Sequence, residues 1–72
     1  MSDLEMIPVS SSNIAAIGYD KEKSELYIEF NSGWTYRYDG VAPWYFKNLM
    51  NAPSKGKAFD MYIRHNITGT RL

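Results

Sequence analysis

The sequence predicts an α+β fold: a three-stranded antiparallel β-meander, followed by two α-helices packed on one face of the sheet (βββαα). Residues 14–38 consist of short apolar or alternating segments separated by polar turns, whereas apolar residues in the segment 43–65 recur at helical spacing. The first pattern is typical of strands and the second of amphipathic helices. Strands that precede the helices, rather than alternate with them, favour an α+β layer over a parallel sheet.

The first two predicted strands are residues 14–19 (IAAIGY) and 25–30 (ELYIEF). The first is a short apolar run that ends in the polar loop DKEKS. The second alternates strictly, so that its apolar side chains lie on one face and its glutamates on the other, as in a half-buried strand. Its apolar face is formed by Leu26, Ile28 and Phe30.

A three-residue turn, residues 31–33 (NSG), connects this strand to a third, residues 34–39 (WTYRYD). Its glycine readily supplies the left-handed conformation that such a turn needs. The turn length sets a register in which Tyr36 and Tyr38 lie on the same face as the apolar side of the preceding strand. We therefore expect both rings to line the core, with their hydroxyls at its rim. The alternative is an exposed platform on which nucleic-acid bases stack.

Two helices are predicted after Gly40. Pro43 suits the first turn of a helix, and Pro53 ends that helix. Ser54 is a natural N-cap for the second helix, residues 54–65 (SKGKAFDMYIRH). The apolar stripes that would face the sheet are Tyr45, Phe46, Leu49 and Met50 on the first helix, and Ala58, Phe59, Tyr62 and Ile63 on the second.

Residues 1–8 and 67–72 show no decisive pattern and are predicted to be loose tails around one domain, residues 9–66. The chain has 72 residues and no cysteine, so a small core must hold it without disulfides. No apolar run approaches the roughly 20 residues that span a bilayer. The start, MSDLEMIPV, is acidic and unlike a secretory signal. We therefore expect a cytoplasmic protein with no membrane partner.

The net charge is zero, but it is unevenly distributed along the chain. Residues 1–39 carry seven acids and three bases, whereas residues 40–72 carry five bases and one acid. If the two halves face different ways, the molecule has a basic pole that suits phosphates or an acidic protein partner. The alternative is that the halves attract each other across the fold.

The residues that catalysis needs are largely missing. His65 is the sole histidine and no cysteine accompanies it, so neither a nucleophile–base pair nor a set of zinc ligands can be built. Asp60 is four residues from Arg64 and is expected to pair with it on the helix surface. We expect a protein that is not an enzyme and that has no metal site and no cofactor.

The most suggestive polar stretch is Ser54, Lys55, Gly56 and Lys57 (SKGK), at the predicted start of the second helix. Free backbone N–H groups, a hydroxyl and two ammonium groups could together hold a phosphate. The alternative is structural: Ser54 caps the helix, and Gly56 lets the backbone approach one of the tyrosine rings of the third strand. Further candidates are Lys47, Arg64 and His65 for phosphate contacts, and Trp34 and Trp44 for an exposed apolar patch.

Several stretches, taken in order, resemble the KTSC domain family: SSNIAAIGYD, LYIEF, G-x-x-Y-x-Y, V-A-P and LMNAPSKGKAFDMYIR. The resemblance spans about residues 9–66, nearly the whole chain. It implies a small bacterial or phage protein, or a module at the C-terminus of some lysyl-tRNA synthetases, with RNA binding as a suggested activity. The family's Tyr-x-Tyr is matched by Tyr36 and Tyr38, and its Ser-x-Gly-x-x-Phe by Ser54, Gly56 and Phe59.

Two functional hypotheses follow. The first is a small non-catalytic module that binds the RNA backbone through its basic second half, above all the SKGK stretch. The second is a protein-interaction module, such as a phage or mobile-element protein that docks on a host protein through Trp34, Trp44 and an open sheet edge. Net neutrality favours the second, because dedicated nucleic-acid domains are usually basic overall. The sequence leaves the oligomeric state open.

Overall fold

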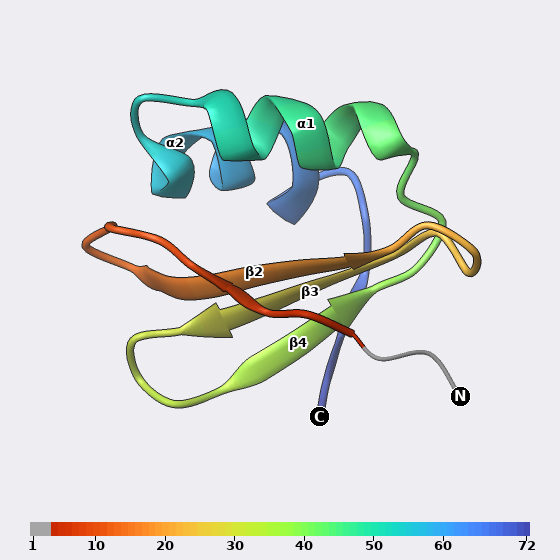
Figure 1. The fold of residues 1–72 in the computed structure, drawn as a ribbon, viewed down its shortest axis with the longest axis horizontal. Coiled ribbons are helices and arrows are strands. Elements are labelled where there is room, and N and C mark those ends of the chain that lie inside the picture. The colour runs from red at the N-terminus through yellow and green to blue at the C-terminus, as the bar shows by residue number, and fades with distance from the viewer. Residues whose placement is uncertain (1–3) are drawn as a thin grey trace.

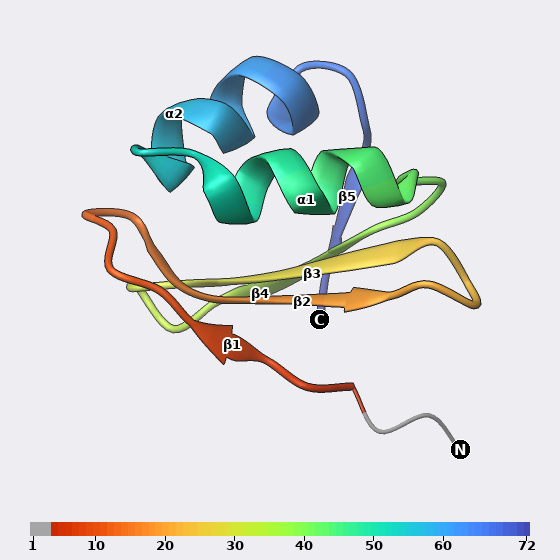
Figure 2. The same cartoon turned by 45° about the horizontal axis from the view of Figure 1, so that its top comes forward.

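The computed structural model describes residues 4–72, which form two layers (Figure 1). One layer is a five-stranded antiparallel sheet with the strand order β1-β2-β3-β4-β5. The helices cover one face of this sheet (Figures 1 and 2). An α+β domain with an antiparallel sheet and helices on one side is therefore confirmed. The elements are β1 (Ile7–Pro8), β2 (Ile14–Asp20), β3 (Glu25–Phe30), β4 (Thr35–Tyr38), α1 (Pro43–Asn51), α2 (Lys55–Phe59), the π-helix η1 (Asp60–Arg64) and β5 (Gly69–Arg71).

The hairpin formed by β3 and β4 has the register predicted from its turn. Ile28 pairs with Tyr36, and Leu26 pairs with Tyr38. Gly33 adopts a φ of 100°, a conformation that side chains disfavour, so the glycine is required by the turn itself. The hairpin therefore presents its apolar residues and both tyrosines to the helical layer.

The core lies between the sheet and the helices. Isoleucines and a leucine from β2 and β3 meet apolar residues of α1, α2 and η1 there, and each fully buried side chain stabilises the fold by roughly 1.5–3 kcal/mol. Tyr19 lies at the core's edge, where its ring stacks on Phe46 with centroids 5.3 Å apart. The largest side chains that are less than 2% exposed are Ile14, Ile17, Leu26, Ile28, Val41, Leu49 and Ile63.

The sheet has five strands, so the predicted number of three is wrong. The additional strands come from the two segments that were expected to be tails. β1 pairs with β2, with Ile7 opposite Ile17, and β5 pairs with β4, with Gly69 opposite Tyr38. Strands of two and three residues are too short to show alternation, and their places depend on contacts with neighbouring strands. Residues 1–3 of the expected N-terminal tail lie outside the described residues.

The helix boundaries follow the signals in the sequence. Pro43 lies in the first turn of α1, which ends at Asn51, two residues before Pro53. Ser54 is the N-cap of α2, and its Oγ accepts a hydrogen bond from the N–H of Lys57 at 3.4 Å. Among residues 4–72, no helix combines the length and the apolar character needed to cross a bilayer.

The second helical segment is not a uniform α-helix. After Phe59 the chain continues as the π-helix η1, whose wider turn rotates the side chains away from the predicted α-helical stripe. Phe59 and Ile63 are buried as predicted. Tyr62 is instead 37% exposed, and the centroid of its ring lies 5.7 Å from that of Trp44. The predicted stripe is therefore wrong at Tyr62, because the helix changes type within it.

Candidate functional site

At the start of α2, the predicted phosphate-binding stretch makes hydrogen bonds within its own helix end. Ser54 caps the helix, and Nζ of Lys55 donates to the carbonyl of Ala52 at 3.1 Å. Lys57 is exposed. Ser54 and Lys55 thus take part in closing the helix start, and Lys57 remains the more accessible ammonium of the pair.

Gly56 does not approach a tyrosine ring, so the structural interpretation of this glycine is wrong. It faces the loop between β1 and β2, where a Cβ added to Gly56 would lie 3.7 Å from Oγ of Ser11 and 3.8 Å from Cβ of Asn13. These are ordinary contact distances. The glycine that approaches a ring is Gly69 in β5, where an added Cβ would overlap the ring of Tyr38.

A groove lies between β4 and η1, with Tyr36, Tyr38 and Arg64 at its centre; we call it the tyrosine groove. It consists of two hollows of about 380 Å³ each, and these three residues line both of them. The first hollow extends toward Asn13, Phe30, Asn31, Phe59 and Asp60, and the second toward His65, Asn66, Thr68 and Gly69.

The two tyrosines of the groove lie side by side on β4. Their ring centroids are 6.3 Å apart and their planes are inclined by 25°. Tyr38 is 6% exposed and Tyr36 is half-buried, so the rings belong to the core wall, as the register predicted. Neither hydroxyl forms a hydrogen bond with a group in residues 4–72. The hydroxyls of Tyr19 and Tyr27, in contrast, donate to Val41 and Glu25.

The groove also perturbs the phenol of Tyr38. Burial raises the pKa of Tyr38 and the neighbouring phenol of Tyr36 raises it further, whereas the guanidinium of Arg64 lowers it. Tyr36 of β4 and Arg64 of η1 line both hollows together with Tyr38, so a second phenol and a guanidinium share the groove with this hydroxyl.

Stability is expected to fall at high pH because of Tyr38. Its pKa in the folded protein is raised above the ordinary value of 10.0, so its contribution is complete below pH 10.0 and is lost as pH rises through the folded pKa. We expect wild type to lose more unfolding free energy than Tyr38→Phe between about pH 9 and about pH 11, measured by urea unfolding. Tyr27, whose pKa is also raised, is common to both proteins. Equal losses in the two proteins would contradict this assignment.

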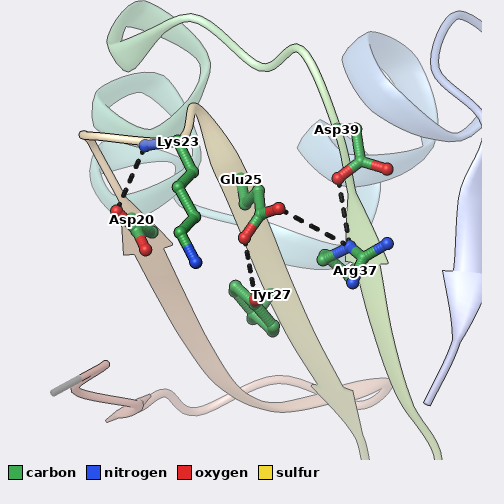
Figure 3. Close-up of polar contacts among 6 residues, drawn as sticks. All are labelled: Asp20, Lys23, Glu25, Tyr27, Arg37 and Asp39. Atoms are coloured by element: carbon green, nitrogen blue, oxygen red, sulfur yellow. Dashed lines mark hydrogen bonds and ion pairs between the residues drawn. The ribbon is translucent and has the colours of Figure 1, made fainter. Parts of the chain in front are cut away.

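The opposite face of the sheet carries acidic residues around one arginine (Figure 3). Nε of Arg37 lies 3.0 Å from a carboxylate oxygen of Asp39 and 3.8 Å from one of Glu25. The hydroxyl of Tyr27 donates to Glu25 at 2.9 Å. Asp39, above all, raises the pKa of Arg37. The charge of Arg37 is therefore balanced within the sheet.

The two tryptophans do not form one patch. Trp34, 50% exposed, precedes β4 at the β3–β4 turn, and the guanidinium of Arg71 lies 4.3 Å from the centre of its ring. Trp44, 54% exposed, lies at the start of α1, and this start and the β3–β4 turn are at opposite ends of the molecule (Figure 1). Trp44 contacts Tyr62 of η1, on which Met61 is 65% exposed.

Comparison with known proteins establishes the family. The KTSC domain model matches residues 10–66 of the chain. This chain belongs to the KTSC domain family. A KTSC domain protein from Yersinia pestis, known from a crystal structure, is 39% identical in sequence to this chain. The two structures superpose with a TM-score of 0.91 over 97% of this chain and 99% of the other. The resemblance expected from the sequence is therefore confirmed.

KTSC relatives differ greatly in length. A protein of Tsukamurella paurometabola is 44% identical over 67 residues, which is 93% of this chain and 100% of the relative. An uncharacterised protein of Stutzerimonas stutzeri is 34% identical over 85% of this chain and 86% of its own. A lysine–tRNA ligase of Nostoc punctiforme is 37% identical over 82% of this chain, but the match covers only 10% of that enzyme.

Three of the five residues that match the KTSC motifs, Tyr36, Tyr38 and Phe59, meet in the tyrosine groove, whereas Ser54 and Gly56 line neither hollow. Phe59 packs edge-on against Tyr38 with ring centroids 5.4 Å apart, and Arg64 lines the groove beside the Tyr-x-Tyr pair. Of the predicted basic residues, only Arg64 and His65 line either hollow of the groove. Sequence reasoning missed Gly69, because its contact with Tyr38 joins β4 to a strand with no signal of its own.

Proposed function

We propose that this KTSC domain is a non-catalytic cytoplasmic binding module that contacts the RNA backbone through the basic side chains of its helical layer. The supporting observation is a separation of charge between the two layers. Residues 43–65 carry four bases against one acid, a net charge of +3. The sheet layer, residues 4–41 and 66–72, carries six acids against four bases, a net charge of −2.

The ion pairs among the described residues stay within their own layer. Arg37 is paired with Asp39 and Glu25 of the sheet, and Arg64 is paired with Asp60 of η1. The acids of the sheet therefore pair with none of the cations of the helical layer in the described part of the chain, and Lys47 and Lys57 are exposed to solvent. Exposed cations of this kind attract phosphates, which supply most of the affinity in nonspecific nucleic-acid binding.

The α1 helix adds an aromatic ring to this basic surface. Trp44 precedes Lys47 by three residues, so the exposed ring and the ammonium group share one side of the helix. Bases of a single strand stack on exposed rings while the backbone contacts nearby cations. This surface therefore suits a single-stranded nucleic acid, and the proposal takes it to be RNA.

The proposal predicts salt-sensitive binding of a mixed-sequence single-stranded RNA, measured by fluorescence anisotropy over a range of salt concentrations. The salt slope is the steepness with which the logarithm of the binding constant falls with the logarithm of the salt concentration. Each lost phosphate contact is expected to lower this slope by about 0.7, so the double variant Lys47→Gln/Lys57→Gln should lower it by roughly 1.4.

A matched control is available at the turn between β2 and β3. Lys21→Gln/Lys23→Gln removes the same charge from two other exposed lysines and should leave the salt slope unchanged. The proposal is rejected if wild type does not bind at low salt, or if the control variant weakens binding as much as the double variant does.

A second candidate function, docking on a host protein as part of a phage or mobile element, is favoured by the exposed apolar residues of the helical layer. These are Trp44, Met61 and Tyr62. A protein partner held by this surface would stay bound after nuclease treatment and in high salt, and Trp44→Ala would release it. An interaction that nuclease abolishes would exclude this candidate.

A further inference from the structure

The hydroxyls of Tyr36 and Tyr38 are the least expected feature of the tyrosine groove. Only 6% of Tyr38 as a residue is exposed, and the hydroxyl of so deeply buried a tyrosine normally has a hydrogen-bond partner in the protein. Neither hydroxyl has one among residues 4–72. No fully enclosed side-chain oxygen or nitrogen lacks a partner in this part of the chain, so both hydroxyls open toward the groove.

Arg64 supplies a third donor group at the same place. It lines both hollows together with the two tyrosines. One of its guanidinium nitrogens, Nη1, binds a carboxylate oxygen of Asp60 at 3.2 Å, which leaves the other N–H groups of the fork available. Two O–H groups and a guanidinium form a donor set whose natural acceptor is an oxyanion.

Asp60 limits where such an anion can lie. Its carboxylate lines the first hollow and is absent from the second. Repulsion therefore disfavours an anion beside Asp60 in the first hollow and favours the lining that the two hollows share, at Arg64 and the two tyrosines. The rest of the first hollow is lined by the aromatic rings of Phe30 and Phe59 and by the side chains of Asn13 and Asn31.

We propose that the tyrosine groove binds one internal phosphodiester of single-stranded RNA, held by the hydroxyls of Tyr36 and Tyr38 and by the guanidinium of Arg64. A hollow of about 380 Å³ on each side of these groups gives room for the nucleoside on each side of the phosphate. The identity of the ligand as RNA rests on the proposed function. The groove itself does not depend on Lys47 or Lys57, which line neither hollow.

The test is an NMR titration of the isotope-labelled protein with diuridine monophosphate (UpU), which has a single internal phosphodiester. We expect saturable shifts of the Tyr36, Tyr38 and Arg64 signals. Uridine at the same concentration should not shift them, and inorganic phosphate should shift the same signals with lower affinity. The double variant Tyr36→Phe/Tyr38→Phe keeps both rings and should weaken UpU binding at least about tenfold, because hydrogen bonds to a charged group are lost.

Two further single variants test whether the groove itself holds the phosphate. Tyr27→Phe removes a hydroxyl from the opposite face of the sheet and should leave the affinity for UpU unchanged. Asp60→Asn removes the opposing charge and frees Arg64, so it should raise the affinity. UpU binding that is insensitive to the double phenylalanine variant, or equally weakened by Tyr27→Phe, overturns the proposal, as does binding of uridine equal to that of UpU.

The outcomes also separate this inference from the proposed function. If longer RNA binds with the expected salt slope but Tyr36→Phe/Tyr38→Phe changes nothing, the groove is rejected and the basic helical surface stands. If UpU shifts the groove residues while Lys47→Gln/Lys57→Gln does not affect longer RNA, the groove stands and the helical surface is rejected.

Discussion

Replacing Phe59 by alanine is expected to lower the free energy of unfolding by about 3–5 kcal/mol, most of the stability of a domain of this size. Phe59 is 5% exposed and joins the helical layer to the sheet. Its ring lies edge-on to Phe30 and Tyr38, with centroids 5.5 Å and 5.4 Å away, so truncation opens a cavity at this junction. Urea unfolding followed by circular dichroism measures the loss.

Tyr62 is the matched control for this prediction. It lies three residues after Phe59 but is 37% exposed, and its ring contacts that of Trp44 at the surface. Tyr62→Ala should therefore cost about 1 kcal/mol or less, as expected for a surface ring contact. If the two variants lose the same stability, Phe59 does not have the central role that we assign to it.

Gly69→Ala is expected to lower the free energy of unfolding by about 1–3 kcal/mol, the usual effect of overpacking. Gly69 lies directly opposite Tyr38 in the β4–β5 pair, and a methyl group there would overlap the tyrosine ring. The ring cannot turn away freely, since Phe59 packs against it. We expect β5 to move off the sheet edge instead, so the amides that pair β5 with β4 should exchange hydrogen faster than in wild type.

Gly56→Ala should instead raise the free energy of unfolding. A Cβ at Gly56 would make ordinary contacts, and the residue lies inside α2, where alanine is the better helix former. We expect a gain of about 0.5 kcal/mol. Destabilisation by Gly56→Ala together with no effect of Gly69→Ala would reverse our reading of the two glycines.

The sequence was informative where local rules decide the structure. The three-residue turn ending in Gly33 set the pairing of Ile28 with Tyr36, and strict alternation placed both on the core face. Pro43 and Ser54 marked the starts of the two helices because each acts on its own backbone within one turn. In each case the cause and its effect lie within a few residues of each other.

Features that depend on distant contacts were not predictable. β5 is held by pairing with β4 and by the ring of Tyr38 over Gly69, and no local pattern in its three residues indicates a strand. The chain also changes from α2 to the π-helix η1 at Asp60. This change takes Tyr62 outward although its spacing from Phe59 fits an α-helical stripe.

The candidate site was predicted in pieces. Strand alternation predicts that Tyr36 and Tyr38 lie together, and Arg64 is recognisable as a basic residue, but their meeting depends on how η1 lies relative to β4. The SKGK stretch predicts a phosphate site because a helix start can bind anions. The structure directs Lys55 to a carbonyl of its own chain, a bond that residue types alone do not reveal.

The two outermost strands, β1 and β5, limit the pairing of this sheet with strands of other chains. An exposed sheet edge is a template on which strands of neighbouring molecules can assemble into aggregates. Here the edges are only two and three residues long, and Pro8 in β1 has no N–H to offer. Such short edges discourage unwanted pairing with a neighbouring chain. This property would be useful in a relative such as the lysine–tRNA ligase, in which the matching segment is only 10% of a longer protein.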